Sequence, residues 1–408
     1  MKILHTSDWH LGRTLYGRKR YDEFEAFLDW LGQIIEAESV DVLLVAGDIF
    51  DTAAPSNRAQ ALYYQFLCRI AGSSCRHVVV IAGNHDSPSF LDAPRELLKA
   101  LSVHVVGAAA DDPQQEVIVL HDRDGRPELI ACAVPYLRDR DIRLVEAGES
   151  PASKEQKLVE GIRRHYEVVG EAASAVRATL GGDIPIVGMG HLFTAGGQTI
   201  EGDGVRELYV GSLAHITAAI FPDCFDYVAL GHLHVPQKVG GHEHIRYSGS
   251  PLPMGFGEAR QQKSVCLIDF DGCQPKIRTL DIPCFQALCR FSGDWEALAT
   301  GIAKLVDDNS NAWLEINYDG EDVISDLRQR LETAIEGSNL EILRIRNNRI
   351  VERALGRMRE DETLDDLDVF DVFQRCLDAH DIATDQRELL QNAYHETVMS
   401  LQEESDAN

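Results

Sequence analysis

Short apolar runs alternate with amphipathic stretches over the first 280 residues of this 408-residue chain. The runs have the length and the β-branched content of buried strands in a mainly parallel sheet. Between them, apolar positions recurring about every 3.6 residues predict helices at 20–38, 56–71, 89–101 and 153–179. An alternation of this kind indicates an α/β fold.

Five of the apolar runs end in residue types that bind metal ions. The segments are 2–10, 42–48, 78–86, 184–191 and 228–234, and they carry Asp8, His10, Asp48, Asn84, His191, His232 and His234. Functional groups of an open α/β sheet gather beyond the carboxyl ends of its strands, so we expect these side chains to share one crevice. Any one segment could equally be a core strand that ends in an ordinary polar turn, but the fivefold repetition favours a site.

Glycines stand just before several of these residues. Gly47, Gly83, Gly190 and Gly231 occupy that place. Because glycine has no Cβ, the backbone there can turn sharply and approach an ion closely. Side chains two apart on an extended chain also point the same way, which pairs Asp8 with His10 and His232 with His234.

The seven residues predict a centre of two divalent ions. Carboxylate, imidazole and amide groups without thiolate suit Mn²⁺, Fe²⁺ or Zn²⁺ and argue against a structural zinc cage. Seven ligands are too many for one tetrahedral ion, and Asp48 is the carboxylate that we expect to bridge two. Manganese is the ion that we expect. Two such ions clamp a phosphoryl group and activate a water, which predicts hydrolysis of a phosphate ester.

The motifs around these residues resemble those of a known family. D-x-H at 8–10, G-D-x-x-D at 47–51, G-N-H-D at 83–86, G-H at 190–191 and G-H-x-H at 231–234 are similar to the signatures of the calcineurin-like metallophosphoesterases. The sequence around them resembles the SbcD family of nuclease subunits over essentially the whole chain. The resemblance implies an α/β fold built as a four-layer αββα sandwich, with a small α/β capping domain and C-terminal helices.

The resemblance also implies a role for each motif residue. One ion goes to Asp8, His10, Asp48 and His234, and the other to Asp48, Asn84, His191 and His232. His85 then acts on the phosphate as proton donor to the leaving oxygen, with Asp86 orienting it. The alternative for His85 is an additional or outer ligand, and Asp51 is expected beside the ions rather than on one.

Three parts of the chain are expected. Residues 1–280 form the nuclease domain, and Pro283 marks its expected end. Residues 281–346 alternate strand, helix, strand, helix and strand, which predicts a small α/β unit, the capping domain of the resemblance. Residues 347–408 form a linker and two short amphipathic helices within 362–402 that need a partner surface. The resemblance implies that this partner is the coiled-coil ATPase SbcC, and that the chain forms a homodimer within a heterotetramer.

The charge of the chain opposes simple binding to nucleic acid. Its 66 acidic and 39 basic residues give a net charge of −27, which repels a phosphate backbone at long range. Two divalent ions would return positive charge to the site. The loop after His10 adds Arg13, Arg18, Lys19 and Arg20, which we expect to contact the DNA backbone. The alternative is an ordinary solvated loop.

Nine scattered cysteines without a C-x-x-C pair indicate a reduced compartment, the cytoplasm. The N-terminus has no signal-peptide pattern, and no apolar run approaches 18 residues, so we expect no export and no membrane span.

The sequence thus predicts a metal-dependent DNA nuclease. The resemblance implies 3′–5′ exonuclease activity on duplex ends and endonuclease activity on single strands and hairpins, in DNA repair, recombination and replication. Two alternatives stay open. One is a metallophosphoesterase that acts on nucleotides or phosphoproteins, and the other is a non-catalytic scaffold for DNA ends.

Overall fold

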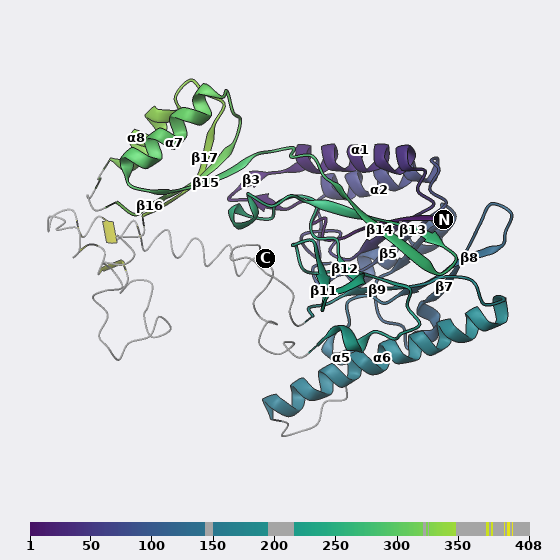
Figure 1. Cartoon of the computed structure of the whole chain (residues 1–408). Coiled ribbons are helices and arrows are strands. Elements are labelled where there is room, and N and C mark those ends of the chain that lie inside the picture. The colour runs from purple at the N-terminus through teal and green to yellow at the C-terminus, as the bar shows by residue number, and fades with distance from the viewer. Residues whose placement is uncertain are drawn as a thin grey trace. The chain divides into compact units, whose positions relative to one another are not determined.

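The computed structural model describes residues 1–142, 150–194, 216–320, 324 and 326–347, with seven single residues nearer the C-terminus: Phe373, Gln374, Leu377, Arg387, Leu390, Gln391 and Tyr394. The chain divides into two compact units, Met1–Leu288 and Cys289–Asn408 (Figure 1). The helices predicted within 362–402 lie largely outside the described residues. The three-part division of the sequence stays a prediction.

Two six-stranded sheets form the frame of the first unit. In spatial order the first contains β14 (Gln274–Asp281), β13 (Ser264–Asp271), β1 (Lys2–Thr6), β4 (Val42–Ala46), β5 (His77–Ile81) and β6 (Val103–Val106). Strands β1, β4, β5 and β6 are parallel, while β13 is antiparallel to β1 and to β14. The expected α/β class with parallel strands is confirmed.

The second sheet repeats this design. It contains β11 (Gln237–Val239), β12 (His242–Tyr247), β10 (Tyr227–Gly231), β9 (Ile186–His191), β8 (Pro127–Ala133) and β7 (Val117–His121). Strands β8, β9, β10 and β12 are parallel, and an antiparallel strand closes each edge. The strands that precede the predicted ligands are therefore central strands of the two sheets.

Helices cover the outer faces. They are α1 (Tyr21–Glu38), α2 (Asn57–Ala71), α3 (Pro88–Asp92), α4 (Arg95–Lys99), α5 (Asp139–Ile142) and α6 (Pro151–Leu180). Short 3₁₀ turns lie at η1 (Pro113–Glu116), η3 (Ala218–Ile220) and η4 (Phe256–Glu258), and β2 (Thr14–Leu15) pairs with β3 (Arg18–Lys19). Helices α1 and α2 lie on one side of the unit and α5 and α6 on the opposite side (Figure 1).

The alternation of side chains along the strands separates three apolar cores. In β4, Leu43 and Val45 face the core shared with α1 and α2, whereas Val42 and Leu44 face the core between the two sheets. Strand β10 is divided in the same way, because Val228 contributes to the core under α6. Strands buried on both faces need continuous apolar runs, which explains why these segments show no polar alternation.

One predicted helix differs in the structure. The stretch 89–101 forms two short helices, α3 and α4, with Ala93 and Pro94 between them. Proline has no N–H to donate and its ring clashes with the preceding turn, so a continuous helix cannot pass Pro94.

The second unit carries the predicted alternation of strands and helices. Its described elements are β15 (Leu288–Gly293), which begins at the last residue of the first unit, α7 (Trp295–Asp307), β16 (Trp313–Tyr318), α8 (Leu327–Ile335) and β17 (Glu341–Asn347). The strand order is β15-β16-β17. Helix α7 begins where Asp294 accepts a hydrogen bond from the backbone N–H of Ala297, a standard N-cap.

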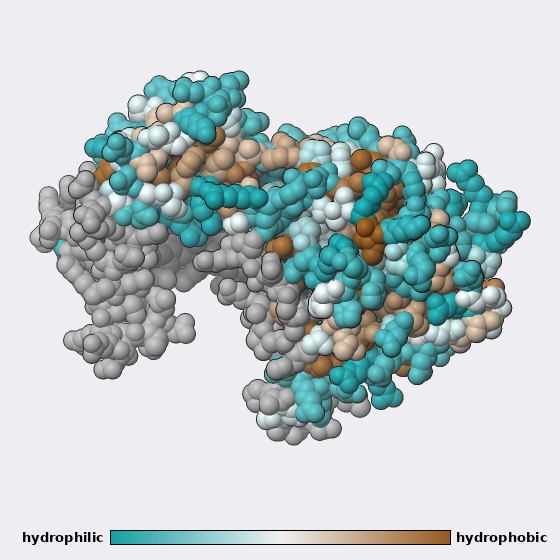
Figure 2. Space-filling model, viewed as in Figure 1, coloured by the Kyte–Doolittle hydropathy of each residue, from teal (hydrophilic) through white to brown (hydrophobic). Residues whose placement is uncertain are grey.

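The visible surface of the first unit is mainly hydrophilic, with small hydrophobic groups between (Figure 2). Within the described part of the chain, no helix combines the length and the apolar character needed to cross a bilayer.

Candidate metal centre

The carboxyl ends of β1, β4, β9 and β10 meet at one edge of the two sheets. The loops after β1 and β4 are joined by backbone hydrogen bonds, since Asp8 N–H donates to Gly47 O at 3.0 Å and His10 N–H to Asp48 O at 2.9 Å. From the other sheet, the backbone N–H of His232 donates to Asp8 Oδ1 at 2.9 Å. These bonds fix the ligand loops relative to one another.

The seven predicted ligands converge. His10 Nε2 lies 3.1 Å from His234 Nε2 and 3.6 Å from Asp48 Oδ2. His191 Nε2 lies 3.3 Å from Asp48 Oδ2 and 3.0 Å from Asn84 Oδ1. The same Asn84 oxygen lies 3.0 Å from His232 Nδ1. Asp48 thus stands between a group that contains His10 and a group that contains His191.

These distances fit bound divalent ions. An ion about 2.1 Å from each of two ligands at right angles leaves those ligand atoms about 3 Å apart. In the described part of the chain, Asp8, His10 and His234 place ligand atoms within 4.8 Å of one another, and so do Asp8, Asp48 and His191. A third such group, His10, Asp51 and His85, keeps the alternative of His85 as an additional ligand open.

Glycine is required at the four predicted positions. A Cβ would lie 2.2 Å from His191 Nδ1 at Gly47, 2.1 Å from Asp48 Oδ1 at Gly83, 2.2 Å from the Tyr166 hydroxyl at Gly190 and 1.9 Å from Ala46 O at Gly231. No side chain fits at these separations, so each of these positions needs glycine to pack against its protein neighbours, and the predicted approach to an ion stays a prediction.

The ligand loops also hold unusual backbone conformations. Asp8, His10 and Asp48 have φ of 52°, 47° and 50°, and His232 has φ of 104°. Residues other than glycine rarely occupy this left-handed region, and each instance costs about 1–3 kcal/mol. The hydrogen bonds between the loops over-determine these conformations and offset that cost.

Polar groups behind the ligand imidazoles orient them, through a hydrogen bond at His191 and a nearby carboxylate at His10. His191 Nδ1 lies 2.9 Å from Ala46 O, and His10 Nδ1 lies 3.4 Å from Asp51 Oδ1. Such acceptors leave the opposite ring nitrogen, Nε2, for a metal ion. Ser7 Oγ donates to Asp8 Oδ2 at 2.5 Å and also contacts the Ser248 hydroxyl at 2.8 Å. Asp51 lies next to the predicted ligand His10, and its place beside the ions rather than on one stays a prediction.

The environment of Asp86 differs from the prediction. Its carboxylate accepts hydrogen bonds from the backbone N–H groups of Ile49 at 3.1 Å, Phe50 at 2.9 Å and Gly83 at 2.9 Å. His85 instead places Nδ1 2.8 Å from Asp51 O, and its backbone N–H donates to Asp48 Oδ1 at 2.8 Å. The carbonyl of Asp51 orients the imidazole, and Asp86 holds the loop, because the turn leaves three amides that need an acceptor.

Burial and charge together set the ionisation of the cluster. Burial acts to raise the pKa of Asp48, but the surrounding histidines, His191 foremost with His10 and His85, together outweigh it and hold that pKa well below its usual range. Burial opposes the charging of His191 as well, yet the Asp48 carboxylate raises the pKa of His191 to about 9. Burial lowers the pKa of His232 to about 3, and His191 adds to this effect. A buried carboxylate that stays ionised and is stabilised by neighbouring positive charge is typical of a cation-binding site.

The basic loop is only partly available to a ligand. Arg20 is fully buried: it forms a two-point ion pair with Glu23 and donates to Pro253 O at 2.6 Å. The prediction that Arg20 contacts DNA is wrong, because the guanidinium is used to fasten the loop at Pro253 to α1. Arg13 donates to Asp51 Oδ1 at 3.1 Å. Arg18 and Lys19 are exposed on β3.

Two residues of the centre were missed from the sequence. Glu258 and Lys263 are buried in the loop after Ser250 and form an ion pair. The one sequence signal for the burial of Glu258 and Lys263 is that they lie close to an apolar strand, 264–270.

Family models match both parts of the chain. The model for calcineurin-like phosphoesterases matches residues 1–236, and the SbcD_C model, described as type 5 capsule protein repressor C-terminal domain, matches residues 284–381. The chain is 35% identical over 410 residues to the SbcD component of the nuclease SbcCD of Escherichia coli K12, with 100% of both chains covered.

Proteins of the same name from two other bacteria are similar over two thirds of their length. Identity is 38% over 278 residues, 67% of each chain, for Rhodobacter capsulatus, and 37% over 273 residues, 66% of each chain, for Bacillus subtilis. A solved β-glucosidase of Exiguobacterium marinum matches weakly, with a TM-score of 0.23 and 11% identity over 84% of this chain and 88% of that chain, which says nothing about the fold.

The substitution Gly83→Ala tests the metal centre. Its Cβ would lie 2.1 Å from Asp48 Oδ1 and displace the central carboxylate, so we expect affinity for Mn²⁺ to fall about tenfold or more, measured by calorimetric titration. Gly72→Ala is the control, because Gly72 has φ of −93° and its nearest new neighbour would be Arg69 O at 3.6 Å. Wild-type affinity in Gly83→Ala would contradict the geometry.

Proposed function

The chain belongs to the SbcD family of calcineurin-like phosphoesterases and is a metal-dependent nuclease subunit, and we propose that it hydrolyses DNA phosphodiester bonds at the centre around Asp48. The observation that carries this proposal is the convergence of four histidines, Asp48 and Asn84 with separations of 3.0–3.6 Å between ligand atoms. Buried carboxylate, amide and imidazole groups gathered at such distances suit the binding of divalent cations.

We divide the ligands between two ions. Asp8, His10, Asp48 and His234 would hold one, and Asp48, Asn84, His191 and His232 the other, with manganese the expected metal. When bound, the two ions supply a positive clamp on the phosphoryl oxygens and a water of lowered pKa as nucleophile. The carboxylate of Asp8 stays available to either group, because it belongs to both clusters of potential ligands.

His85 is the residue that we expect to handle the leaving group. Its Nδ1 faces the Asp51 carbonyl, so an N–H there donates to that oxygen and leaves Nε2 for the substrate. A proton carried on Nε2 can then pass to the departing oxygen. Asp86 supports this role indirectly, since it fixes the loop that carries Asp51.

The remaining architecture agrees with the layered design of the family. The three cores, with helices outside both sheets, support a four-layer αββα sandwich. Residues 281–346 would act as the cap that places DNA. Its sheet brings Arg290, Arg344 and Arg346 around the buried Glu315, and guanidinium groups of this kind suit contact with phosphate groups.

Contact with the DNA backbone near the metals is assigned to Arg18 and Lys19. Both are exposed in the β2–β3 hairpin, which leaves the same strand end as Asp8 and His10. The ring of Tyr16, 48% exposed, stacks on Phe256 beside them and adds a surface for a base. Arg13 can assist only if it leaves Asp51.

A homodimer is proposed on the surface around α4. Leu97 is 72% exposed and Leu101 is 36% exposed, which is unusual for leucines in a compact unit. Both lie in the region of the family's dimer contact. Two such chains with two SbcC chains would form the heterotetramer.

The C-terminal segment is the proposed grip on SbcC. The rings of Phe373 and Tyr394 stack with centroids 3.9 Å apart, which supports two helices packed on each other. Leu390 is 37% exposed and offers an apolar contact. Exonuclease action on duplex ends, endonuclease action on hairpins and single strands, and roles in DNA repair, recombination and replication are proposed from the family.

We propose that the protein acts in the cytoplasm. The eight cysteines that the structure describes are free thiols, which suits a reducing compartment.

His85→Ala should abolish most cleavage while metal binding remains. We expect the rate on labelled duplex DNA with Mn²⁺ to fall about 10²–10⁴-fold, because the leaving oxygen loses its proton donor. Quenched-flow rates and calorimetric Mn²⁺ titrations measure the two effects. Hydrolysis of small phosphate esters alone by the wild type would favour the nucleotide or phosphoprotein phosphoesterase, and DNA binding without cutting would favour the scaffold.

Arg18→Ala with Lys19→Ala should weaken DNA binding at every sequence. Loss of two phosphate contacts lowers the slope of log affinity against log salt by about 2, which fluorescence anisotropy between low and moderate salt can measure. The control pair, Arg123→Ala with Arg126→Ala, removes two exposed arginines from the β7–β8 turn, at the amino end of β8. An equal loss in both double variants would refute the assignment.

Leu97→Asp should convert the dimer to a monomer. A buried carboxylate at an apolar contact is strongly unfavourable, and light scattering during size-exclusion chromatography reads the mass directly. Leu180→Asp is the matched control, because Leu180 is 38% exposed at the C-terminus of α6. A dimer that survives Leu97→Asp would place the contact elsewhere.

A further inference from the structure

Behind the metal centre lies a buried ion pair that the catalytic scheme above does not use. Glu258 and Lys263 are both almost completely buried, and their side chains contact each other directly. Lys263 Nζ also donates to His234 O and to Ser250 Oγ, each at 3.0 Å, and to Gln261 Oε1 at 3.1 Å. A buried ammonium with this many acceptors is fully compensated.

The two oxygens of Glu258 have different surroundings. Oε2 accepts from Lys263 and from the backbone N–H of Met254 at 3.0 Å. Oε1 is buried, has no hydrogen-bond partner among the described residues and lies 3.6 Å from His234 Nδ1. An unsatisfied buried carboxylate oxygen is costly, so its position behind a ligand imidazole calls for an explanation.

We infer that Glu258 is a positioning residue for the ligand His234, and that Lys263 compensates the buried charge of Glu258. The inference rests on the proposed function, because it needs His234 to bind an ion through Nε2. With Nε2 on the ion, the proton of the ring sits on Nδ1 and points to Glu258 Oε1. An acceptor there fixes the orientation of the ring and strengthens its donor nitrogen.

Two other histidines of the centre have acceptors in the same place. His191 has Ala46 O and His10 has Asp51 Oδ1 behind Nδ1. Glu258 supplies the corresponding group for His234 from a different part of the chain. Residues 250–263 follow the other site segments along the chain, so the group behind His234 comes from a segment remote from His234 itself.

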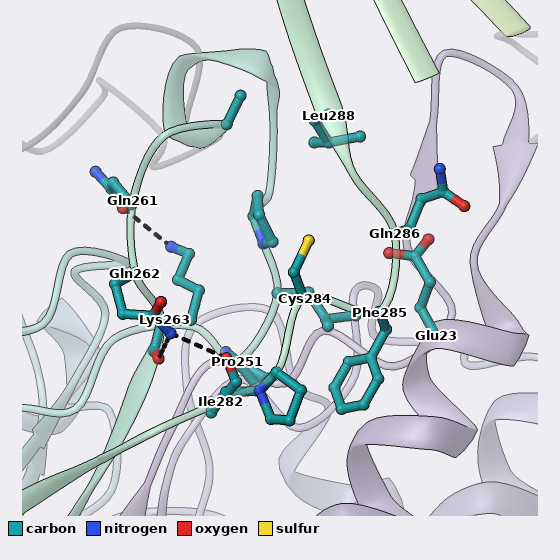
Figure 3. Close-up of a pocket in the computed structure, with 14 residues that line it drawn as sticks. Glu23, Pro251, Gln261, Gln262, Lys263, Ile282, Cys284, Phe285, Gln286 and Leu288 are labelled. Atoms are coloured by element: carbon teal, nitrogen blue, oxygen red, sulfur yellow. Dashed lines mark hydrogen bonds between the residues drawn. The ribbon is translucent and has the colours of Figure 1, made fainter. Parts of the chain in front are cut away.

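Lys263 also connects this loop to the segment that leaves the first unit. The backbone N–H of Ile282 donates to Lys263 O at 2.8 Å, and Gln262 Nε2 donates to Ile282 O at 2.9 Å. A pocket of about 60 Å³ lies over these residues, and Figure 3 shows Lys263 and Gln261 on one side of it and Pro251, Ile282, Cys284 and Phe285 below. The ion pair therefore lies between the metal ligand and a small recess.

Two double variants separate positioning from simple stability. Glu258→Gln with Lys263→Met and Glu258→Met with Lys263→Met both remove the buried charges and have similar volumes, but only the first keeps an oxygen facing His234 Nδ1. In full-length protein titrated with Mn²⁺ and followed by calorimetry and by electron paramagnetic resonance of free Mn²⁺, we expect the glutamine variant to bind two ions nearly as the wild type does. The methionine variant should bind one of the two about 10–100-fold more weakly.

A second buried ion pair provides the control. Arg20 and Glu23 fasten the same loop through Pro253 O and contact no ligand histidine that the structure describes. Arg20→Met with Glu23→Met should lower the melting temperature but leave both Mn²⁺ affinities unchanged.

The outcomes are distinct. Wild-type affinity for both ions in a folded Glu258→Met, Lys263→Met protein would overturn the inference, and so would an equal loss in the Arg20, Glu23 control. If the methionine variant does not fold, Glu258→Asp decides, because it keeps the charge beside Lys263 but withdraws the oxygen from Nδ1. We expect weaker binding of one ion there, and wild-type binding would again refute the inference. Failure of the wild type to bind two ions would instead refute the proposed function.

Discussion

The first unit depends on one constraint, which is that carboxylates and imidazoles from two separate sheets must lie together almost without solvent. Asp8, His10 and His234 are essentially buried, and so are Asp48 and His191. Leaving a buried charge uncompensated costs several kcal/mol. The cluster is stable only if each charge has a partner of opposite sign, and the opposed pKa shifts of Asp48 and His191 express that requirement. Divalent ions would also supply positive charge beside the buried carboxylates. The stability of the fold and the proposed chemistry therefore both need positive charge at this place.

The backbone is the second part of this constraint. Asp8, His10, Asp48 and His232 adopt positive φ. Glycines directly precede Asp48 and His232, and a Cβ there would meet His191 Nδ1 at Gly47 and Ala46 O at Gly231. These conformations persist because other groups hold them, among them the Asp86 carboxylate with its three amide donors. Asp86 therefore acts on the site through the shape of a loop. His85 takes its orientation from that loop and not from its neighbour in sequence.

The chain has few basic residues, which limits how it can bind DNA. With a net charge of −27, the chain has few cations to place near DNA. Arg20 and Lys263 are buried, and each forms an ion pair that helps to hold the loop 250–263 in place. Long-range attraction for DNA is weak in such a chain. Binding would then rest on the ions of the centre, a short basic hairpin and the arginines around Glu315.

The sequence by itself determined the α/β class, the strand that carries each ligand and the glycines that admit them, because these features are local: buried strands, turns and close approaches leave their mark on consecutive residues. It also predicted the seven candidate ligands, whose side chains the structure brings together. Only the tertiary structure decided the roles of Arg20, Asp86, Glu258 and Lys263. Whether a charged side chain faces solvent, a backbone amide or a ligand histidine depends on residues up to 233 positions away, as between Arg20 and Pro253. Such pairings arise from the packing of two sheets and their loops, and no local pattern encodes them.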